Sequence, residues 1–193
     1  MLLLGFGAAL RRSGLVALRL GNIEPVSGRG VRLPVRRSKI DQHGQGQEIA
    51  VWANPAEPAL CPLAALEGWR AHRDRTRDLH WSATESARQE RPLFCAVTKA
   101  GRPIEAALSD KAVARLAKGA AGRAGLDLQR YGGHLVRAGL ATAAGDAGAA
   151  LPDLKRQTRH KSTQVALAYL RPADLWRNNV TKRVFAAKKD GIN

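Results

Sequence analysis

The chain has 193 residues, enough for one domain with a buried core or for two small ones. It carries 32 Lys and Arg against 16 Asp and Glu, a formal net charge of +16, while 45% of its residues are hydrophobic. Such a chain folds and attracts polyanions, so we expect nucleic acid as the first partner and an anionic membrane as the second. The two cysteines, Cys61 and Cys95, exclude a disulfide framework and lack zinc-knuckle spacing, and we predict that both are reduced and buried.

The first 19 residues are spaced for a helix. Leu10, Leu15 and Leu18 recur at helical intervals, which predicts one helix from Leu2 to Arg19 with Gly21 as a stop. The ten apolar residues at the start precede the positive charges instead of following them and are too few to span a bilayer, which argues against a signal peptide and a membrane helix. We therefore expect a cytoplasmic protein.

A β-hairpin follows. Val31, Leu33 and Val35 alternate with polar residues or proline, residues 41–46 form a polar glycine-containing turn, and residues 48–52 form a second extended run. Pro34 cannot donate to a strand ladder, so the first strand of the hairpin is predicted to lie at a sheet edge.

The rest of the chain reads as mainly helical. A charged stretch over 74–91 predicts a loop, and a short apolar strand is expected over 92–97. Ser109 is the expected cap of a helix that Gly125 ends. Helices are further predicted over 63–73, 133–145, 152–160 and 162–170, with a tail after Pro172. The predicted fold class is mainly α with a small antiparallel β-sheet near the N-terminus (α+β).

Two basic groups in the first 40 residues are candidates for phosphate chemistry. An arginine inside an apolar helix needs an anion or a carboxylate, which makes Arg11 a candidate, although Arg11 and Arg12 also read as surface arginines of an amphipathic helix. Lys39 ends a strand before the glycine-containing turn and could swing into a bound phosphate. A solvated lysine that protects a sheet edge explains it equally well.

Two further groups lie in the last third. His134 and Arg137 are spaced i and i+3, so one helix face presents both, as an oxyanion clamp or as ordinary surface residues. His160 precedes the helix that Ser162 or Thr163 begins, and Tyr169 lies near the end of that helix. A tyrosine in an apolar helix is more often a core residue, and its neighbours are what favour a functional role.

The ordered set resembles the active-site signature of the tyrosine recombinases, the phage integrase family. Arg11 precedes Lys39 by 28 residues, Arg137 precedes His160 by 23, and His160 precedes Tyr169 by 9, each as in that family. The six matched positions are Arg11, Lys39, His134, Arg137, His160 and Tyr169. The resemblance extends over residues 4–185 and implies the tyrosine recombinase catalytic-domain fold.

The resemblance implies a strand-transfer reaction without cofactor or metal. Tyr169 would be the nucleophile that attacks the scissile phosphate and leaves a 3′-phosphotyrosyl link. Arg11 and Arg137 would hold the non-bridging oxygens, in the charge-stabilising role that Mg²⁺ has elsewhere. Spacing to Lys39 favours Arg11 over Arg12 as the first arginine.

The same resemblance implies roles for the remaining basic residues. Lys39 would protonate the departing 5′-oxygen as general acid, and His134 and His160 would donate hydrogen bonds, with His134 also the candidate acceptor of the tyrosine proton. Three further basic residues are expected to bind DNA outside the reacting phosphate: Arg36, Arg37 and Lys161.

The expected organisation is a single catalytic domain over 1–193, without the N-terminal core-binding domain that usually precedes it in the family. The tail over 172–193 would form a helix that docks on a neighbouring subunit or packs on its own domain. The partners implied are double-stranded DNA and further copies of the chain, as in the family's tetrameric synapse. No membrane is implied, and the setting would be the nucleoid of a bacterium or the DNA of a phage or mobile element.

Two residues depart from the family's pattern. Gly14 stands where an acidic residue commonly follows the first arginine, and Arg159 replaces the usual glycine before the second histidine, where a bulky side chain would shift His160 or demand a less strained backbone. Together with the expected lack of the N-terminal domain, they motivate one alternative to a recombinase, a DNA-binding remnant that does not cut. A related type IB topoisomerase is a further alternative. Charge favours DNA in each case, because residues 1–40 carry 8 basic and 1 acidic residue and residues 150–193 carry 10 and 3.

Overall fold

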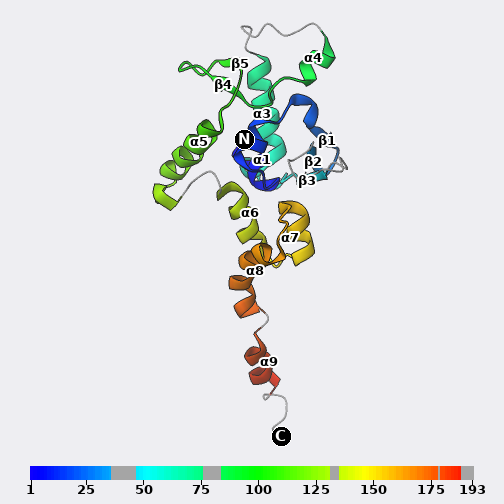
Figure 1. The fold of residues 1–193 in the computed structure, drawn as a ribbon, viewed down its shortest axis with the longest axis vertical. Coiled ribbons are helices and arrows are strands. Elements are labelled where there is room, and N and C mark those ends of the chain that lie inside the picture. Colours follow the sequence, from blue (N-terminus) through cyan, green and yellow to red (C-terminus); the bar gives the residue numbers. More distant parts are fainter. Residues whose placement is uncertain (36–46, 76–83, 131–134, 178, 188–193) are drawn as a thin grey trace. The chain divides into compact units, whose positions relative to one another are not determined.

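The structure, a computed structural model, describes residues 1–35, 47–75, 84–130, 135–177 and 179–187. The chain divides into two compact units, Met1–Arg137 and Ala138–Asn193, and the boundary falls inside helix α6 (Leu135–Asp146) (Figure 1). Each unit has its own hydrophobic core. The prediction of one catalytic domain over residues 1–193 stays a prediction.

The N-terminal helix predicted over residues 2–19 is wrong as one element. The chain forms α1 (Leu2–Gly7) and α2 (Arg12–Val16). Between them Ala9 adopts a left-handed conformation, with φ of 47°, and is fully buried. One left-handed residue ends a right-handed helix, so the chain changes direction before α2 begins. The leucine spacing survives because both helices bury their leucines in one core.

The predicted hairpin is confirmed in its strands and extended by a third one. The strands β1 (Glu24–Val26), β2 (Gly30–Val35) and β3 (Gln47–Trp52) form an antiparallel sheet in the order β1-β2-β3. Strand β2 is therefore central, and the edge-strand prediction is wrong. Pro34 is tolerated because β1 pairs only with residues 30–32, so β3 is its one neighbour among the described strands.

The remainder of unit 1 corrects two predictions and confirms two. The predicted loop over 74–91 contains the short helix α4, and the strand β4 has a partner strand β5 that sequence did not reveal. Ser109 caps α5 through a hydrogen bond from the Ala112 N–H to its Oγ (3.2 Å), and Gly125 follows that helix with φ of 69°. The bounds are α3 (Pro62–Asp74), α4 (Glu85–Gln89), β4 (Cys95–Val97), β5 (Pro103–Ala107) and α5 (Asp110–Arg123).

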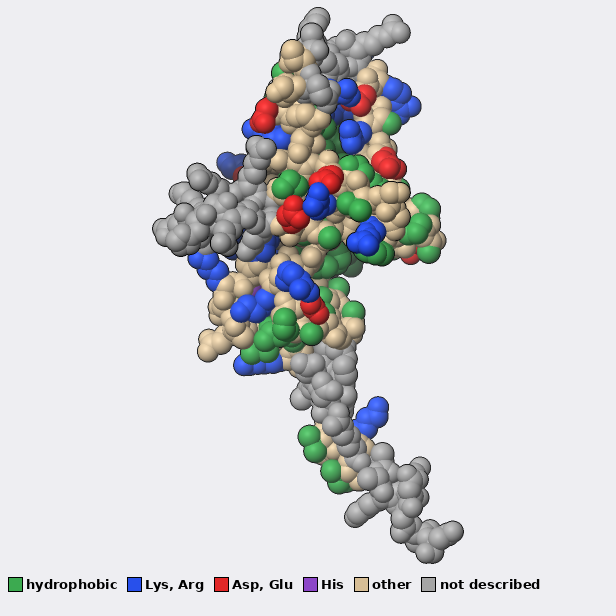
Figure 2. Space-filling model, turned by 90° about the vertical axis from the view of Figure 1, so that its right-hand side faces the viewer, with side chains coloured by type: hydrophobic (Ala, Val, Ile, Leu, Met, Phe, Trp, Pro, Cys, Tyr) green, Lys and Arg blue, Asp and Glu red, His purple; other side chains and the backbone are tan. Residues whose placement is uncertain are grey.

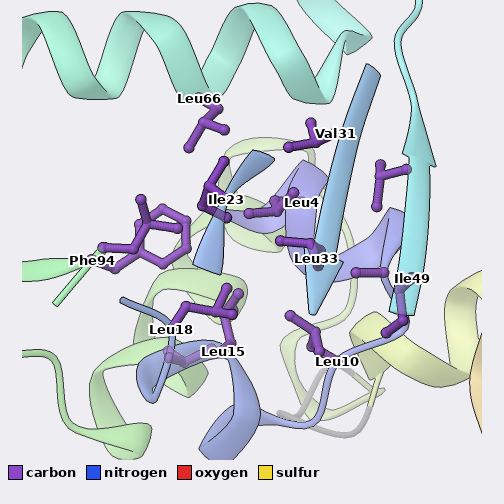
Figure 3. Packing of buried hydrophobic residues seen from close by; sticks show 14 residues of the cluster. Leu4, Leu10, Leu15, Leu18, Ile23, Val31, Leu33, Ile49, Leu66 and Phe94 are labelled. Carbon is purple, nitrogen blue, oxygen red and sulfur yellow. The ribbon is translucent and has the colours of Figure 1, made fainter. Parts of the chain in front are cut away.

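The core of unit 1 joins its helices to the three-stranded sheet. Figure 3 shows Leu66 of α3 facing the strand residues Val31 and Leu33, with Leu4 of α1 on the same side of the sheet. Both cysteines are buried and free, as predicted. The Cys61 Sγ accepts a hydrogen bond from the Ala64 N–H (3.5 Å) and so caps α3.

Unit 2 is helical throughout its described part. The remainder of α6 is followed by α7 (Leu151–Thr158), α8 (Thr163–Arg177) and α9 (Val180–Ala187). The prediction that the helix ends at Leu170 is wrong, because α8 continues past Pro172 to Arg177. One proline removes one backbone donor, and the helix continues here despite that loss.

The fold class predicted from sequence is confirmed: mainly helical, with small antiparallel sheets. None of the helices in the described part of the chain combines the length and apolar character needed to cross a bilayer.

Candidate active site

Arg11 lies at the start of α2 and not inside an apolar helix, which corrects the local prediction. Its backbone is extended, with φ of −70° and ψ of 156°, and its carbonyl accepts from the Leu15 N–H (2.9 Å). The side chains of Leu10 and Leu15 on either side are buried, while that of Arg11 is exposed. The guanidinium of Arg11 is thus available to an external anion. Arg12, the first residue of α2, is half-buried.

Arg137 is half-buried in the first turn of α6 and contacts the segment that leads to Arg11. Its Nη1 donates to the carbonyl oxygen of Ala9 (3.3 Å), across 128 positions of sequence. The left-handed conformation of Ala9 belongs to the turn that presents this carbonyl. A guanidinium held by a backbone oxygen keeps its orientation while other N–H groups serve a ligand. Within unit 1 the structure therefore brings Arg137 to Ala9, two residues before Arg11.

In unit 2, the turn between α7 and α8 carries His160. Leu154 and Thr158 are buried at i and i+4 on one face of α7. Arg159 then adopts φ of 56° and ψ of 39°, the left-handed geometry that commonly ends a helix. Just beyond this residue, His160 Nδ1 lies 2.9 Å from the Thr158 Oγ1. The expectation that Arg159 shifts the backbone to a less strained form is not met, since the arginine takes the strained form.

His160 and Tyr169 lie together. Their rings are stacked, with centroids 5.6 Å apart and planes 6° from parallel. Tyr169 is half-buried and packs against the unit 2 core of Ala141, Leu154, Ala166 and Leu170. The helix α8 begins at Thr163, and the Ser162 Oγ accepts from the Val165 N–H (3.4 Å), so Ser162 is the cap. The nine-residue spacing of His160 and Tyr169 thus becomes a direct ring contact.

Four of the predicted site residues lie outside the described residues: Arg36, Arg37, Lys39 and His134. Their roles stay predictions. Lys161 is exposed in the turn next to His160, a position that DNA could reach, and its role also stays a prediction. No group of three or more metal-ligating side chains gathers in the part of the chain that the structure describes.

Comparison with known proteins shows what the chain as a whole resembles. No family model matches the sequence. A curated integrase/recombinase XerD homologue from Selenomonas ruminantium is 32% identical over 186 residues, which are 96% of this chain and 50% of the relative. The chain thus spans about half the length of this relative.

Three solved structures share the fold. The XerH site-specific recombinase bound to its difH substrate gives a TM-score of 0.62 at 15% identity and covers 87% of this chain and 40% of that one. The XerA recombinase gives 0.58 at 16% identity, over 86% and 48%. The Tn1549 transposon integrase in complex with transposon right end DNA gives 0.54 at 14% identity, over 91% and 57%.

The chain is therefore similar to the tyrosine recombinases in sequence and in fold.

Three residues that contact or pack against the candidate site residues were missed from sequence. Ala9 acts through its carbonyl, Thr158 through its hydroxyl, and Gly145 by having no side chain, since a Cβ there would lie 2.7 Å from the Tyr169 carbonyl oxygen. The family signature has no position for them. The net charge of +16 follows from the sequence alone, but its distribution does not. On the face shown in Figure 2 the Lys and Arg side chains lie in small groups among apolar and acidic ones.

Proposed function

We propose that this chain cuts and rejoins double-stranded DNA through a covalent bond between Tyr169 and a 3′-phosphate. The observation that carries the proposal is the stacked pair of His160 and Tyr169, which joins the second histidine and the nucleophile of the signature. The family relationship supports the reaction class. The relatives' names supply recombination as the outcome, and the site chemistry supplies the steps.

The proposed first step is a transesterification. The Tyr169 oxygen forms a bond to phosphorus as the bond from phosphorus to the 5′-oxygen breaks, so the number of phosphoester bonds is conserved. The tyrosine proton leaves to a base, for which His134 is the proposed acceptor, and Lys39 gives a proton to the 5′-oxygen. Attack by a second 5′-hydroxyl reverses the step and rejoins the strands. No nucleotide is consumed.

Arg11 and Arg137 are the proposed stabilisers of the transition state. Negative charge grows on the non-bridging oxygens in the pentavalent geometry, and guanidinium groups hold such oxygens in pairs. The exposed side chain of Arg11 and the Ala9-anchored guanidinium of Arg137 support these roles. Arg36, Arg37 and Lys161 are proposed to bind neighbouring phosphates, which makes binding fall steeply with salt.

A nicked suicide substrate tests the proposal. Cleavage beside a nick releases a short strand and traps the protein on DNA, so the expected result is a covalent adduct on a denaturing gel. Tyr169→Phe removes the adduct, whereas Tyr131→Phe, at the only other tyrosine, retains it. Absence of an adduct with the wild type, or its survival in Tyr169→Phe, refutes the proposal. Salt-sensitive binding without any adduct would identify a DNA-binding protein that does not cut.

We also propose that copies of the chain assemble on DNA through α9. Val180, Val184 and Phe185 are 71%, 53% and 71% exposed, and Figure 2 shows apolar side chains on this helix. Exposed apolar side chains on one short helix are typical of a docking element. Phe185→Ser is expected to reduce multi-protomer complexes in a gel-shift titration while single-protomer binding stays within about twofold. Unchanged multi-protomer complexes contradict the role of α9. Such complexes on chromosomal DNA would place the protein at the nucleoid.

A further inference from the structure

Thr158 is the fully buried partner of His160. Its exposed fraction is 0%, and its Oγ1 makes two short contacts. One, of 2.7 Å, reaches the carbonyl oxygen of Leu154 one turn earlier in α7. The other, of 2.9 Å, reaches His160 Nδ1. A buried hydroxyl that contacts both a carbonyl and an imidazole nitrogen raises the question of which group donates in each contact.

The chemistry of the groups decides the direction of both bonds. A threonine hydroxyl has one proton to donate, and a carbonyl oxygen can only accept. Thr158 must therefore donate to Leu154, because two oxygens 2.7 Å apart in a buried site need a proton between them. Towards His160 the same oxygen can then only accept. The proton of that second bond must be on Nδ1.

We infer that Thr158 is a positioning residue that holds His160 in its Nδ1–H tautomer. In a neutral imidazole only one nitrogen carries a proton, so Nε2 is then the acceptor. The stack on Tyr169 fixes the plane of the ring, and the bond to Thr158 fixes which nitrogen turns towards α7. Together the two contacts set the orientation of Nε2 before any DNA binds.

This inference rests on the proposed function where it touches catalysis, and it changes the expected role of His160. A non-bridging phosphate oxygen can only accept, so a neutral His160 of this tautomer cannot donate to it through Nε2. Donation requires the imidazolium, whose Nδ1–H still donates to Thr158. Thr158 thus serves both charge states of the ring, whereas an apolar side chain in its place would leave Nδ1 without this partner.

The tautomer can be measured without DNA. Protein labelled with ¹⁵N-histidine is observed at about pH 8.5, where a histidine of ordinary pKa is neutral, and His160→Gln identifies the His160 signals among those of the five histidines. The wild type is expected to show a protonated Nδ1 and an unprotonated Nε2. Thr158→Val, which keeps the side-chain shape, is expected to shift His160 towards the Nε2–H form. Thr158→Ser keeps the hydroxyl, although it loses a buried methyl group, and is expected to keep the wild-type tautomer.

A wild-type His160 in the Nε2–H form overturns the inference, and so does an unchanged tautomer in Thr158→Val. A shift in Thr158→Ser equal to that in Thr158→Val also overturns it, because packing and not the hydroxyl would then set the tautomer. Far-UV circular dichroism confirms that both variants are folded before spectra are compared. These outcomes hold whether or not the protein cuts DNA.

The same variants also test whether Thr158 affects the proposed reaction. With the nicked substrate, Thr158→Val is expected to form the adduct about 10- to 100-fold more slowly, as when the partner that orients a functional histidine is lost. Thr158→Ser is expected to stay within about threefold of the wild type. Equal rates for Thr158→Val and the wild type overturn the catalytic part. An Nδ1–H tautomer in a protein that forms no adduct retains the role of Thr158 and refutes only the proposed function.

Discussion

Gly145 is the position where one added carbon atom tests the packing around Tyr169, the proposed nucleophile. It lies in α6, and a Cβ there would be 2.7 Å from the carbonyl oxygen of Tyr169 and 3.5 Å from Leu170 Cδ2. Ordinary contact begins at 3.4 Å, so α8 must retreat by about 0.7 Å at Tyr169. A backbone carbonyl inside a helix cannot rotate away alone. Gly145→Ala is therefore expected to displace the backbone of Tyr169.

Two opposed effects set the change in stability. Overpacking against a backbone atom costs about 1–3 kcal/mol. Replacing a helix-interior glycine by alanine returns up to about 1 kcal/mol. We expect a net loss of up to about 2 kcal/mol in the free energy of unfolding. The displacement of Tyr169 is expected to slow adduct formation by about 10- to 100-fold, since about 1 Å of misplacement costs about that much in rate.

Urea unfolding followed by circular dichroism and adduct formation on the nicked substrate measure the two effects. Gly68→Ala is the matched control, because Gly68 is also inside a helix, α3, and its added Cβ would meet no atom within 4 Å. That variant is expected to gain up to about 1 kcal/mol and to keep its activity. If Gly145→Ala is as stable as Gly68→Ala and reacts at the wild-type rate, α6 and α8 are not packed as closely as described.

Three further predictions concern stability. Arg159→Gly relieves a left-handed arginine and is expected to raise the free energy of unfolding by about 1 kcal/mol, whereas Arg156→Gly inside α7 lowers it by about 1 kcal/mol; changes of the same sign in urea unfolding contradict this. Burial raises the pKa of the Cys95 thiol, so this thiol ionises at lower pH in the unfolded chain than in the folded one. The free energy of unfolding of the wild type should therefore fall relative to that of Cys95→Ala as pH rises from about 8 to 10. A constant difference between the two proteins over this pH range would count against this prediction. Ser109→Ala removes the α5 cap and should cost about 1 kcal/mol in thermal unfolding, while Ser109→Asp keeps an acceptor and most of the stability.

Periodic sequence patterns predicted most of the helices and strands, and the main errors of prediction came from backbone conformations at single residues. The alternation of Val31 and Leu33 gave the hairpin because one sheet face is buried, and Val31 pairs with Val51 as that pattern requires. The break at Ala9 left no such trace, since alanine favours helix and its left-handed conformation comes from tertiary packing. Strand β1 was missed because it has only three residues, too few to show alternation.

The candidate site divides in the same way. Sequence spacing found His160 and Tyr169, and the structure stacks their rings. Sequence spacing did not find Thr158. A threonine at the end of a helix has many ordinary explanations, and its partner His160 lies only two residues further along the chain. Ala9 was equally hidden, since a carbonyl that meets Arg137 across the fold leaves no mark in residue type. The side chains proposed to react were therefore recognisable from sequence, whereas the groups that contact and orient them were not.

The replacement of the family's usual glycine by Arg159 affects the stability of the fold and not the position of His160. Glycine reaches the left-handed region without strain, and an arginine there costs about 1–2 kcal/mol. Arg159 adopts that conformation nevertheless, with φ of 56°, and the contact between Thr158 and His160 forms just beyond it. The turn therefore keeps the geometry that places the His160 imidazole, and the strain at Arg159 lowers the stability of the fold instead of displacing the ring.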